Sequence, residues 1–259
     1  MRYSLILGKL KENMHKLNGK VALVTGASKG IGAITALELA KNGAAVIVNY
    51  NGSYEAAQKV VADIKLAGGQ AIALQADVSK EDEVAKLFDE GIGAMGKIDI
   101  LVNNAGLMIT KPIGQVSSDE FDKLISTNVK GVFNTLHQAA SKLADKGSVI
   151  NLSSTVTRTM FPGYGIYCAT KGAVEQLTRI FAKEVGSRGI NVNAVAPGPT
   201  ETELFLNGKT QQDIDRLANS NAFGRLGQPE DIARVIVTLA GDDSKWISGQ
   251  IIGANGAMA

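Results

Sequence analysis

Tyr167 and Lys171 are the two residues of this chain whose types and spacing best suit chemistry. They stand four positions apart, so on a helix they lie on one face about one turn from each other. A nearby ammonium favours the phenolate, and we expect it to lower the pKa of Tyr167 from the usual value of about 10. A tyrosine of this kind can donate a proton to a carbonyl or accept one from an alcohol near neutral pH. The pair therefore predicts an acid–base site.

Ser154 is the nearest candidate partner for this tyrosine. It ends the segment 148–154, whose apolar run followed by hydroxyls is typical of a buried strand that stops at a polar edge. A strand end, a loop and a helix can bring Ser154 beside Tyr167. Neither feature is specific alone, because a Tyr–Lys spacing of four also arises by chance on a surface helix and a lone serine is often a helix cap.

A glycine-rich run at residues 25–32 follows the first apolar segment. Glycine there permits a tight turn and a close approach of the backbone to a pyrophosphate, which the following helix N-terminus binds with free N–H groups. The candidate cofactor residues of this run are Gly26, Ser28, Lys29, Gly30, Ile31 and Gly32. A phosphate-binding loop together with an acid–base tyrosine predicts hydride transfer. A second glycine pattern at 91–96 follows a helix and leads into a strand, so it predicts a helix C-cap and a turn.

The end of the second predicted strand indicates which dinucleotide binds. NAD-binding folds usually place an acidic residue there, but this chain offers Asn49, Tyr50, Asn51 and Ser53. Without a carboxylate to repel it, a 2′-phosphate could bind Lys29 and Ser53 by charge and hydrogen bond. We therefore expect NADP(H), with a preference for NADPH over NADH as the electron donor. The alternative is that Lys29 is only a solvated loop charge.

The elements that must position these residues alternate between short apolar runs and amphipathic stretches. Strands are predicted at 21–25, 45–50, 71–76, 98–103, 148–152, 191–196 and 250–253. Their continuous apolar character suits strands that are covered on both faces. Ser53 and Ser79 are cap candidates for the helices after the second and third strands. The pattern predicts an α/β fold, a single-domain Rossmann-like doubly wound parallel β-sheet of about seven strands with helices on both faces.

Composition excludes several classes of function. The 259 residues contain 27 Lys and Arg against 25 Asp and Glu, a net charge of +2 that offers no basic field for nucleic acid. No run of 18 apolar residues is present, so we expect no membrane span. One cysteine, Cys168, excludes an internal disulfide, and with only two histidines it argues against a metal site. We interpret Cys168 as a small packing residue.

The chain divides into a short extension and one domain. Residues 1–16 make a poor signal peptide and are expected to be dispensable, so a truncation that starts at Met14 should keep its activity. Residues 17–259 are predicted to form a single dinucleotide-binding catalytic domain, because no Pro/Gly/Ser-rich linker divides them. Residues 200–222 interrupt the regular alternation and are the candidate substrate lid. We expect a cytoplasmic protein.

Taken together, these residues resemble the short-chain dehydrogenase/reductase family over residues 17–259. The matching motifs are the loop 25–32, Asp77 and Val78, the run 103–106, Asn128, Ser154, Tyr167 with Lys171, and Pro197 with Gly198. Their joint order and spacing are far more specific than any one of them. The C-terminal run 251–256 departs from the family pattern, where an acidic residue and paired glycines are frequent. That departure concerns tail contacts between subunits and not the chemistry.

The resemblance implies a role for each matching position. Tyr167 is the general acid in reduction, Lys171 binds the nicotinamide ribose, Ser154 holds the substrate carbonyl, and Asn128 supports a water-linked proton path to Lys171. Further implied cofactor contacts are Asp77, Val78, Asn104, Ala105, Gly106, Pro197, Gly198, Thr200 and Thr202. The family commonly forms homotetramers through the helices after the fourth and fifth strands. The implied activity is NADPH-dependent reduction of a ketone or aldehyde carbonyl, which is reversible.

The substrate wall is predicted to be apolar. Besides Ser154 and Tyr167, the candidate substrate residues are Met160, Phe161, Tyr164, Leu204 and Phe205. These favour a small-molecule carbonyl with apolar flanks. Open alternatives are a 3-oxoacyl-carrier-protein reductase, a sugar or polyol dehydrogenase and a hydroxynaphthalene-type reductase. A non-catalytic NADP sensor is the remaining alternative, although a binding module would not need Asn128, Ser154, Tyr167 and Lys171 together.

Overall fold

A single parallel sheet organises the computed structural model, which describes residues 16–259. Its strands, in spatial order, are β3 (Ala71–Gln75), β2 (Ala45–Tyr50), β1 (Val21–Val24), β4 (Ile100–Asn103), β5 (Ser148–Leu152), β6 (Asn191–Pro197) and β7 (Ile251–Ala254). All neighbouring strands pair in parallel. This confirms the predicted fold class, and each strand lies within two residues of its expected bounds.

Alternation of side chains along each strand divides the core into two layers. In β1, Ala22 and Val24 pack on one face of the sheet, whereas Val21 and Leu23 pack on the other. Both layers are apolar, which explains why the strands read as continuous hydrophobic runs.

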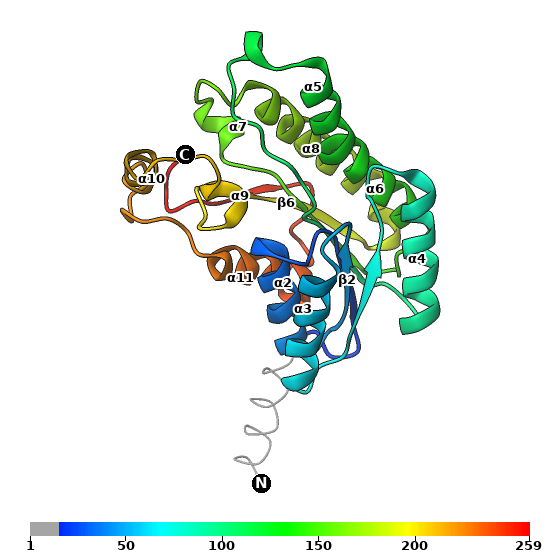
Figure 1. Cartoon of the computed structure of the whole chain (residues 1–259). Coiled ribbons are helices and arrows are strands. Elements are labelled where there is room, and N and C mark those ends of the chain that lie inside the picture. The colour runs from blue at the N-terminus through cyan, green and yellow to red at the C-terminus, as the bar shows by residue number, and fades with distance from the viewer. Residues whose placement is uncertain (1–15) are drawn as a thin grey trace.

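Six long helices cover the two faces of the sheet (Figure 1). One face packs against α2 (Gly30–Lys41), α3 (Tyr54–Leu66) and α11 (Pro229–Ala240). The opposite face packs against α4 (Glu81–Met95), α6 (Gly131–Lys142) and α8 (Gly165–Glu184). The arrangement is the doubly wound one expected when strands and helices alternate.

Shorter elements connect these layers. They are η1 (Ile113–Gln115), α5 (Ser118–Ile125), the π-helical turn η2 (Ser126–Lys130), α7 (Val156–Thr159), η3 (Gly186–Arg188), α9 (Glu203–Leu206), α10 (Gln211–Ala218) and η4 (Asp242–Ser244). The segment predicted as a substrate lid, 200–222, contains α9 and α10. In Figure 1, α10 lies out beyond the helices that cover the sheet, whereas α9 lies close to the start of α2.

The structure confirms only some of the helix caps that the sequence predicts. Gly96 ends α4 with a φ of 84°, and Gly91 and Gly93 lie inside that helix, so the predicted C-cap at 91–96 is correct. Ser53 stands at the N-cap of α3 but its hydroxyl accepts no cap hydrogen bond. The N-cap of α4 is Lys80, because the Ser79 hydroxyl instead donates to Asp77 Oδ1 at 2.7 Å.

Two expectations concern the chain ends and the membrane. Nearly all of the predicted dispensable extension, 1–15, lies outside the described residues, whereas Leu17 is buried in the core. Within residues 16–259, no helix combines the length and apolar character needed to cross a bilayer.

Candidate active site

Two adjoining cavities open beyond the carboxyl ends of the strands, near the point where the strand order reverses between β1 and β4. The glycine-loop cavity, of about 600 Å³, is lined by residues 26–31, the ends of β2 and β3, and the segment after β4. The tyrosine cavity, of about 150 Å³, is lined by the ends of β5 and β6, by α8 and by α9. The two share Ile31, Asn104, Gly106, Leu107, Thr202 and Leu204. A ligand that spans both would therefore meet the glycine loop at one end and Tyr167 at the other.

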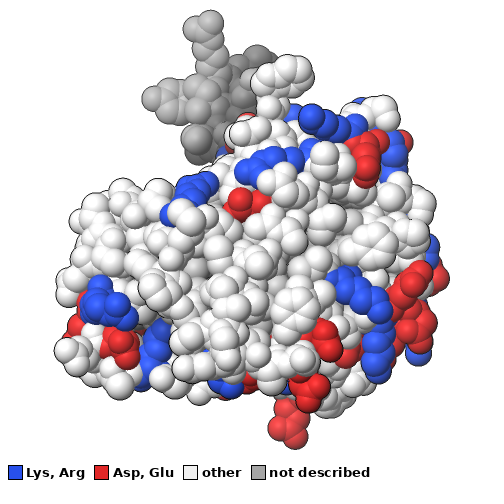
Figure 2. Space-filling model, turned by 90° about the horizontal axis from the view of Figure 1, so that it is seen from above, with Lys and Arg blue, Asp and Glu red and all other residues white. Residues whose placement is uncertain are grey.

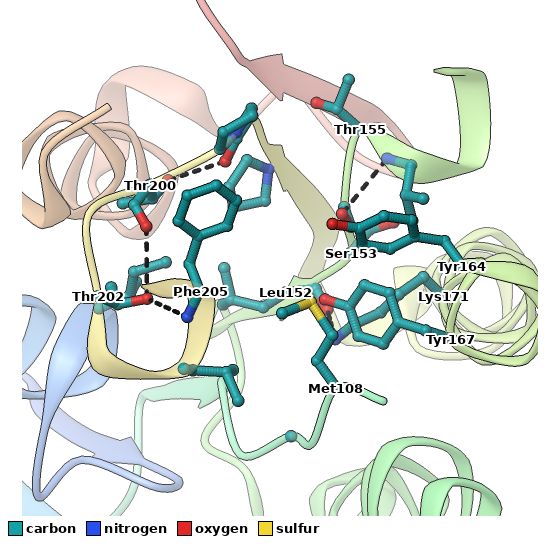
Figure 3. Close-up of a pocket in the computed structure, with 18 of the residues that line it drawn as sticks. Met108, Leu152, Ser153, Thr155, Tyr164, Tyr167, Lys171, Thr200, Thr202 and Phe205 are labelled. Carbon is teal, nitrogen blue, oxygen red and sulfur yellow. Dashed lines mark hydrogen bonds between the residues drawn. The ribbon is translucent and has the colours of Figure 1, made fainter. Parts of the chain in front are cut away.

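Helix α8 carries both Tyr167 and Lys171 into the tyrosine cavity (Figure 3). The ammonium Nζ of Lys171 lies 5.7 Å from the centre of the Tyr167 ring. It donates a hydrogen bond of 2.7 Å to the carbonyl oxygen of Leu152, the last residue of β5. The helical spacing predicted from the sequence therefore brings the two side chains together, and a strand end fixes the direction of the ammonium.

The predicted lowering of the Tyr167 pKa is wrong. Burial raises the pKa of Tyr167 to about 12, and a hydrogen bond with Ser154 offsets only part of that rise. Burial also lowers the pKa of Lys171 to about 8. Both shifts have the same physical cause, because an enclosed site disfavours the charged form of each group. The ammonium contacts the ring and Leu152, so it does not compensate for desolvation at the phenol oxygen.

Ser154 lies where the sequence predicts, just beyond β5 and beside Tyr167. The Ser154 hydroxyl oxygen also accepts a bond of 3.3 Å from the Val156 backbone N–H at the start of α7. A strand end and a short helix thus hold this hydroxyl at the wall of the tyrosine cavity. Ser154 and Tyr167 together present two hydroxyls to a polar atom bound there.

Asn128 lies behind the site and not on its wall. It belongs to the π-helical turn η2 and is buried. Its amide group exchanges two hydrogen bonds of 2.8 Å with the backbone of Leu107 and donates a third, of 3.1 Å, to Thr170 Oγ1. These bonds link the segment after β4 to α8, and π-helical turns are frequent at functional sites. A Cβ at Gly106 would lie 3.3 Å from Asn128 Oδ1 and 3.7 Å from Lys171 Nζ, so all three positions adjoin.

Two asparagine side chains, Asn49 and Asn104, fix the glycine loop through hydrogen bonds to its backbone. Asn49 Oδ1 accepts from the Gly26 N–H at 3.1 Å, and Asn104 Nδ2 donates to the carbonyl oxygens of Thr25 and Gly26. A Cβ at Gly32 would lie only 2.4 Å from Asn104 Nδ2 and 2.5 Å from the Gly26 carbonyl oxygen, so glycine is required there. The loop keeps its shape because neighbouring strands bind its polar groups.

Lys29 has a partner that the sequence did not predict. Its Nζ lies 2.8 Å from Glu203 Oε2 on α9, and both side chains are largely exposed. The ion pair connects the start of α2 to the predicted lid.

Asp77 also lines the glycine-loop cavity. Burial acts to raise the pKa of Asp77, but hydrogen bonds from Ser79 hold that pKa below its usual value. Asp77 is therefore an ionised acceptor on the cavity wall.

Most predicted cofactor residues line one of the two cavities, with two exceptions. Tyr50 is buried and packs edge-to-face against Tyr54, with ring centres 5.9 Å apart. Gly32 lines neither cavity and instead packs closely against Asn104 and the Gly26 carbonyl. The others that line the cavities are Gly26, Ser28, Lys29, Gly30, Ile31, Asn49, Asn51, Ser53, Asp77, Val78, Asn104, Ala105, Gly106, Tyr167, Lys171, Pro197, Gly198, Thr200 and Thr202.

The predicted substrate wall needs one correction. Tyr164, Leu204 and Phe205 line the tyrosine cavity, but Met160 does not. Met160 ends α7 in the left-handed conformation, with a φ of 49°, and is 70% exposed. The next residue, Phe161, lines the cavity as predicted. Phe205 on α9 and Tyr164 at the start of α8 are both drawn among the lining side chains of Figure 3.

Several lining residues carried no signal in the sequence. Lys123, Ser126 and Thr127 reach the glycine-loop cavity from α5 and η2, and Leu217 and Met258 reach the tyrosine cavity from α10 and the C-terminal segment. Ser126 and Thr127 stand just before Asn128, and Leu217 lies in the segment 200–222, but none of the five side chains belongs to a motif itself. Only the folding of the chain brings them to the site.

The tyrosine cavity is almost free of charge. Lys171 is the only Lys, Arg, His, Asp or Glu among the residues that line it, and the rest are apolar, aromatic or neutral polar. On the outside, the face seen in Figure 2 shows basic and acidic side chains side by side around an uncharged centre. That face has no extended field of one sign that would attract nucleic acid.

Comparisons with known proteins agree with this geometry. Residues 26–258 match the protein family described as enoyl-(acyl carrier protein) reductase, adh_short_C2. The probable tetrahydroxynaphthalene reductase of Zymoseptoria tritici is 40% identical over 254 residues, covering 93% of this chain and 95% of that protein. The versicolorin reductase of Emericella nidulans is 42% identical over 254 residues, covering 93% and 96%.

A solved structure extends the likeness to three dimensions. The angucycline C-6 ketoreductase LanV with bound NADP superposes with a TM-score of 0.88 at 38% identity, covering 94% of this chain and 96% of that one. The chain belongs to the short-chain dehydrogenase/reductase family of oxidoreductases, as the motifs predicted.

Proposed function

We propose that this protein is an NADPH-dependent reductase that transfers hydride to the carbonyl carbon of a ketone or aldehyde, and that it also runs the reverse oxidation. The observation that carries the proposal is the convergence of Ser154, Tyr167 and Lys171 in the tyrosine cavity, beside the glycine-loop cavity. Hydroxyl donors aimed at one point suit an oxygen that gains negative charge during hydride addition.

The residues of the glycine-loop cavity fit a dinucleotide with a 2′-phosphate. The volume of about 600 Å³ is within the range of cofactor pockets, and the glycine loop precedes the N-terminus of α2. No carboxylate follows β2, where Asn51 and Ser53 line the cavity, and Lys29 lines the same cavity. LanV, a family member of similar structure, binds NADP.

The roles of the remaining groups follow from their positions. A bound nicotinamide nucleotide supplies the hydride. Ser154 orients the substrate carbonyl, and Tyr167 donates the proton that the new alkoxide requires. Lys171 supplies a positive charge beside both the phenol and the cofactor ribose. Asn128 fixes the backbone at Leu107 and, through Thr170, the turn of α8 between Tyr167 and Lys171.

The substrate is proposed to be a neutral carbonyl compound with apolar or aromatic flanks. Phe161, Tyr164 and Phe205 supply aromatic surface, and no acidic or basic group besides Lys171 faces the cavity. A free keto acid or a sugar phosphate would find no dedicated partner for its charge. Relatives named as hydroxynaphthalene and versicolorin reductases support a polycyclic ketone over an acyl-carrier thioester.

We further propose that the protein is a cytoplasmic homotetramer. Exposed apolar side chains on α5, α6 and α8, among them Phe121, Phe133 and Ile180, support an interface on that side of the molecule. This is the side on which the family resemblance predicts contact between subunits.

Initial rates test the proposed function. Purified protein is incubated with NADPH or NADH and a panel of aryl ketones, β-ketoesters and oxoacyl thioesters. We expect NADPH to be consumed with the aryl and apolar ketones, with kcat/KM for NADPH at least about tenfold above that for NADH. Binding of NADPH without turnover on any carbonyl would favour the sensor alternative, and a preference for NADH would contradict the assignment of the cofactor.

A further inference from the structure

Glu175 lies on the same face of α8 as the two reactive side chains. It follows Lys171 by one helical turn and Tyr167 by two, and its side chain is only 13% exposed. No expectation from the sequence involves it. Its carboxylate is directed at residues 153–157, the segment that leaves β5, enters α7 and carries Ser154.

Glu175 binds this segment on both sides of Ser154. Its Oε1 accepts a hydrogen bond of 2.8 Å from Ser153 Oγ and another of 2.8 Å from Thr157 Oγ1. Hydrogen bonds to an ionised acceptor are stronger and shorter than those between neutral groups. The other carboxylate oxygen, Oε2, lies 3.7 Å from the half-exposed Arg179, so the charge is balanced from the solvent side.

The opposite side of the same segment is attached to the sheet. The Ser153 N–H donates to the Val195 carbonyl at 2.8 Å, and the Thr155 N–H donates to the Pro197 carbonyl at 2.9 Å. These bonds fix the segment to β6 but not to α8. Lys171 connects α8 to Leu152, one residue before the segment begins. Two other α8 side chains also reach the segment, because Cys168 Sγ donates a weak bond of 3.4 Å to the Val156 carbonyl and the Tyr167 hydroxyl bonds Ser154 itself. Glu175 is the α8 side chain that binds the segment on both sides of Ser154.

We propose that Glu175 is a positioning residue that sets the Ser154 hydroxyl relative to the Tyr167 hydroxyl. The inference rests on the proposed function, since it concerns the alignment of the two donors in carbonyl reduction. Misplacement of a reacting group by about 1 Å can reduce a rate on the order of 100-fold. Loss of the carboxylate removes the two hydrogen bonds that hold Ser153 and Thr157 to α8, while the bonds to β6 and the glycine-loop cavity stay intact.

The test compares Glu175→Ala with Glu175→Gln and with Glu184→Ala as a matched control. Glu184 is exposed at the last position of α8 and faces no cavity. We expect Glu175→Ala to lower kcat between about 10-fold and 100-fold, with the NADPH Kd and the number of binding sites unchanged. The primary isotope effect with NADPH deuterated at C4 should rise, because hydride transfer becomes slower. Glu175→Gln keeps an acceptor oxygen, so its kcat should stay within about fivefold of that of the unchanged protein.

A second set of variants keeps the test decisive if Glu175→Ala fails to fold. Ser153→Ala combined with Thr157→Val removes the two donors and leaves Glu175 in place. This pair should reproduce the loss of kcat, and adding Glu175→Ala should lower it no further, because all three changes break the same link.

Two outcomes overturn the inference. One is a kcat within twofold of the unchanged protein for Glu175→Ala or, if that variant does not fold, for the Ser153/Thr157 pair. The other is an equal fall in kcat for Glu175→Ala and Glu175→Gln. Failure of the proposed function has a different signature, because the unchanged protein would then reduce no ketone with NADPH.

Discussion

Burial governs the ionisation of Tyr167 and Lys171. Burial shifts both groups toward their neutral forms, with a pKa of about 12 for Tyr167 and of about 8 for Lys171. The sequence predicted their proximity correctly but not this result, because spacing along a helix says nothing of how far a site is closed to water.

The Lys171 pKa predicts a specific dependence of stability on pH. Its folded value of about 8 lies below the ordinary lysine value of 10.5, so between these values the unfolded chain binds more protons. The free energy of unfolding should then rise with pH from about 8 to 9.5, by up to about 1.4 kcal/mol per pH unit from this group. Urea unfolding of the unchanged protein and of Lys171→Met at several pH values would measure this rise. If the free energy of unfolding had the same slope against pH in both proteins, the lowered pKa of Lys171 would be contradicted.

Phe161 and Met160 test the corrected substrate wall. Phe161→Ala should raise the KM for an aryl ketone by about tenfold or more, because an aromatic side chain is removed from the cavity. Met160→Ala should change KM by less than about twofold, because that side chain is exposed. Steady-state kinetics with saturating NADPH separates the two. A larger rise in KM for Met160→Ala than for Phe161→Ala would contradict the correction and show that Met160 contacts the substrate.

Strands could be predicted from the sequence more closely than the helix ends and loops. Continuous apolar runs identify strands buried on both faces, and every predicted strand is present. Caps were less predictable, since Ser79 binds Asp77 and leaves the N-cap position to Lys80. Met160 could not be placed correctly because one left-handed residue reverses which neighbour faces the cavity. Leu217 and Met258 reach the site only through tertiary packing.

The contact between the start of α2 and α9 predicts how the segment 200–222 affects cofactor affinity. Lys29 pairs with Glu203, so a 2′-phosphate that binds Lys29 must compete with that carboxylate. Glu203→Gln should tighten NADPH binding about two- to fivefold, and Lys29→Gln should weaken it at least about tenfold. Neither change should alter NADH binding, because NADH lacks the phosphate.

Fluorescence titration at low and at high salt would measure these affinities. Salt should reduce the effect of Glu203→Gln, since both side chains are exposed. A parallel change in NADH and NADPH affinity would show that the contact acts on the loop as a whole and not on the phosphate.

At the scale of the whole molecule, the side formed by α5, α6 and α8 exposes large apolar side chains. Phe121 is 43% exposed, Phe133 is 50% exposed and Ile180 is 54% exposed. We expect sedimentation to give a particle of four 27.1 kDa chains. Phe133→Glu should yield smaller species, because a charge buried at an interface is costly. A single-chain particle for the unchanged protein would contradict the proposed assembly.

The central claim is that Tyr167 donates the proton in an NADPH-dependent carbonyl reduction. Tyr167→Phe keeps the ring and removes only the hydroxyl, so its kcat with a good ketone substrate tests this claim most directly. The account predicts a fall of about 1,000-fold or more, with the NADPH Kd within about threefold of the unchanged protein. A residual kcat within tenfold of the unchanged protein would contradict it.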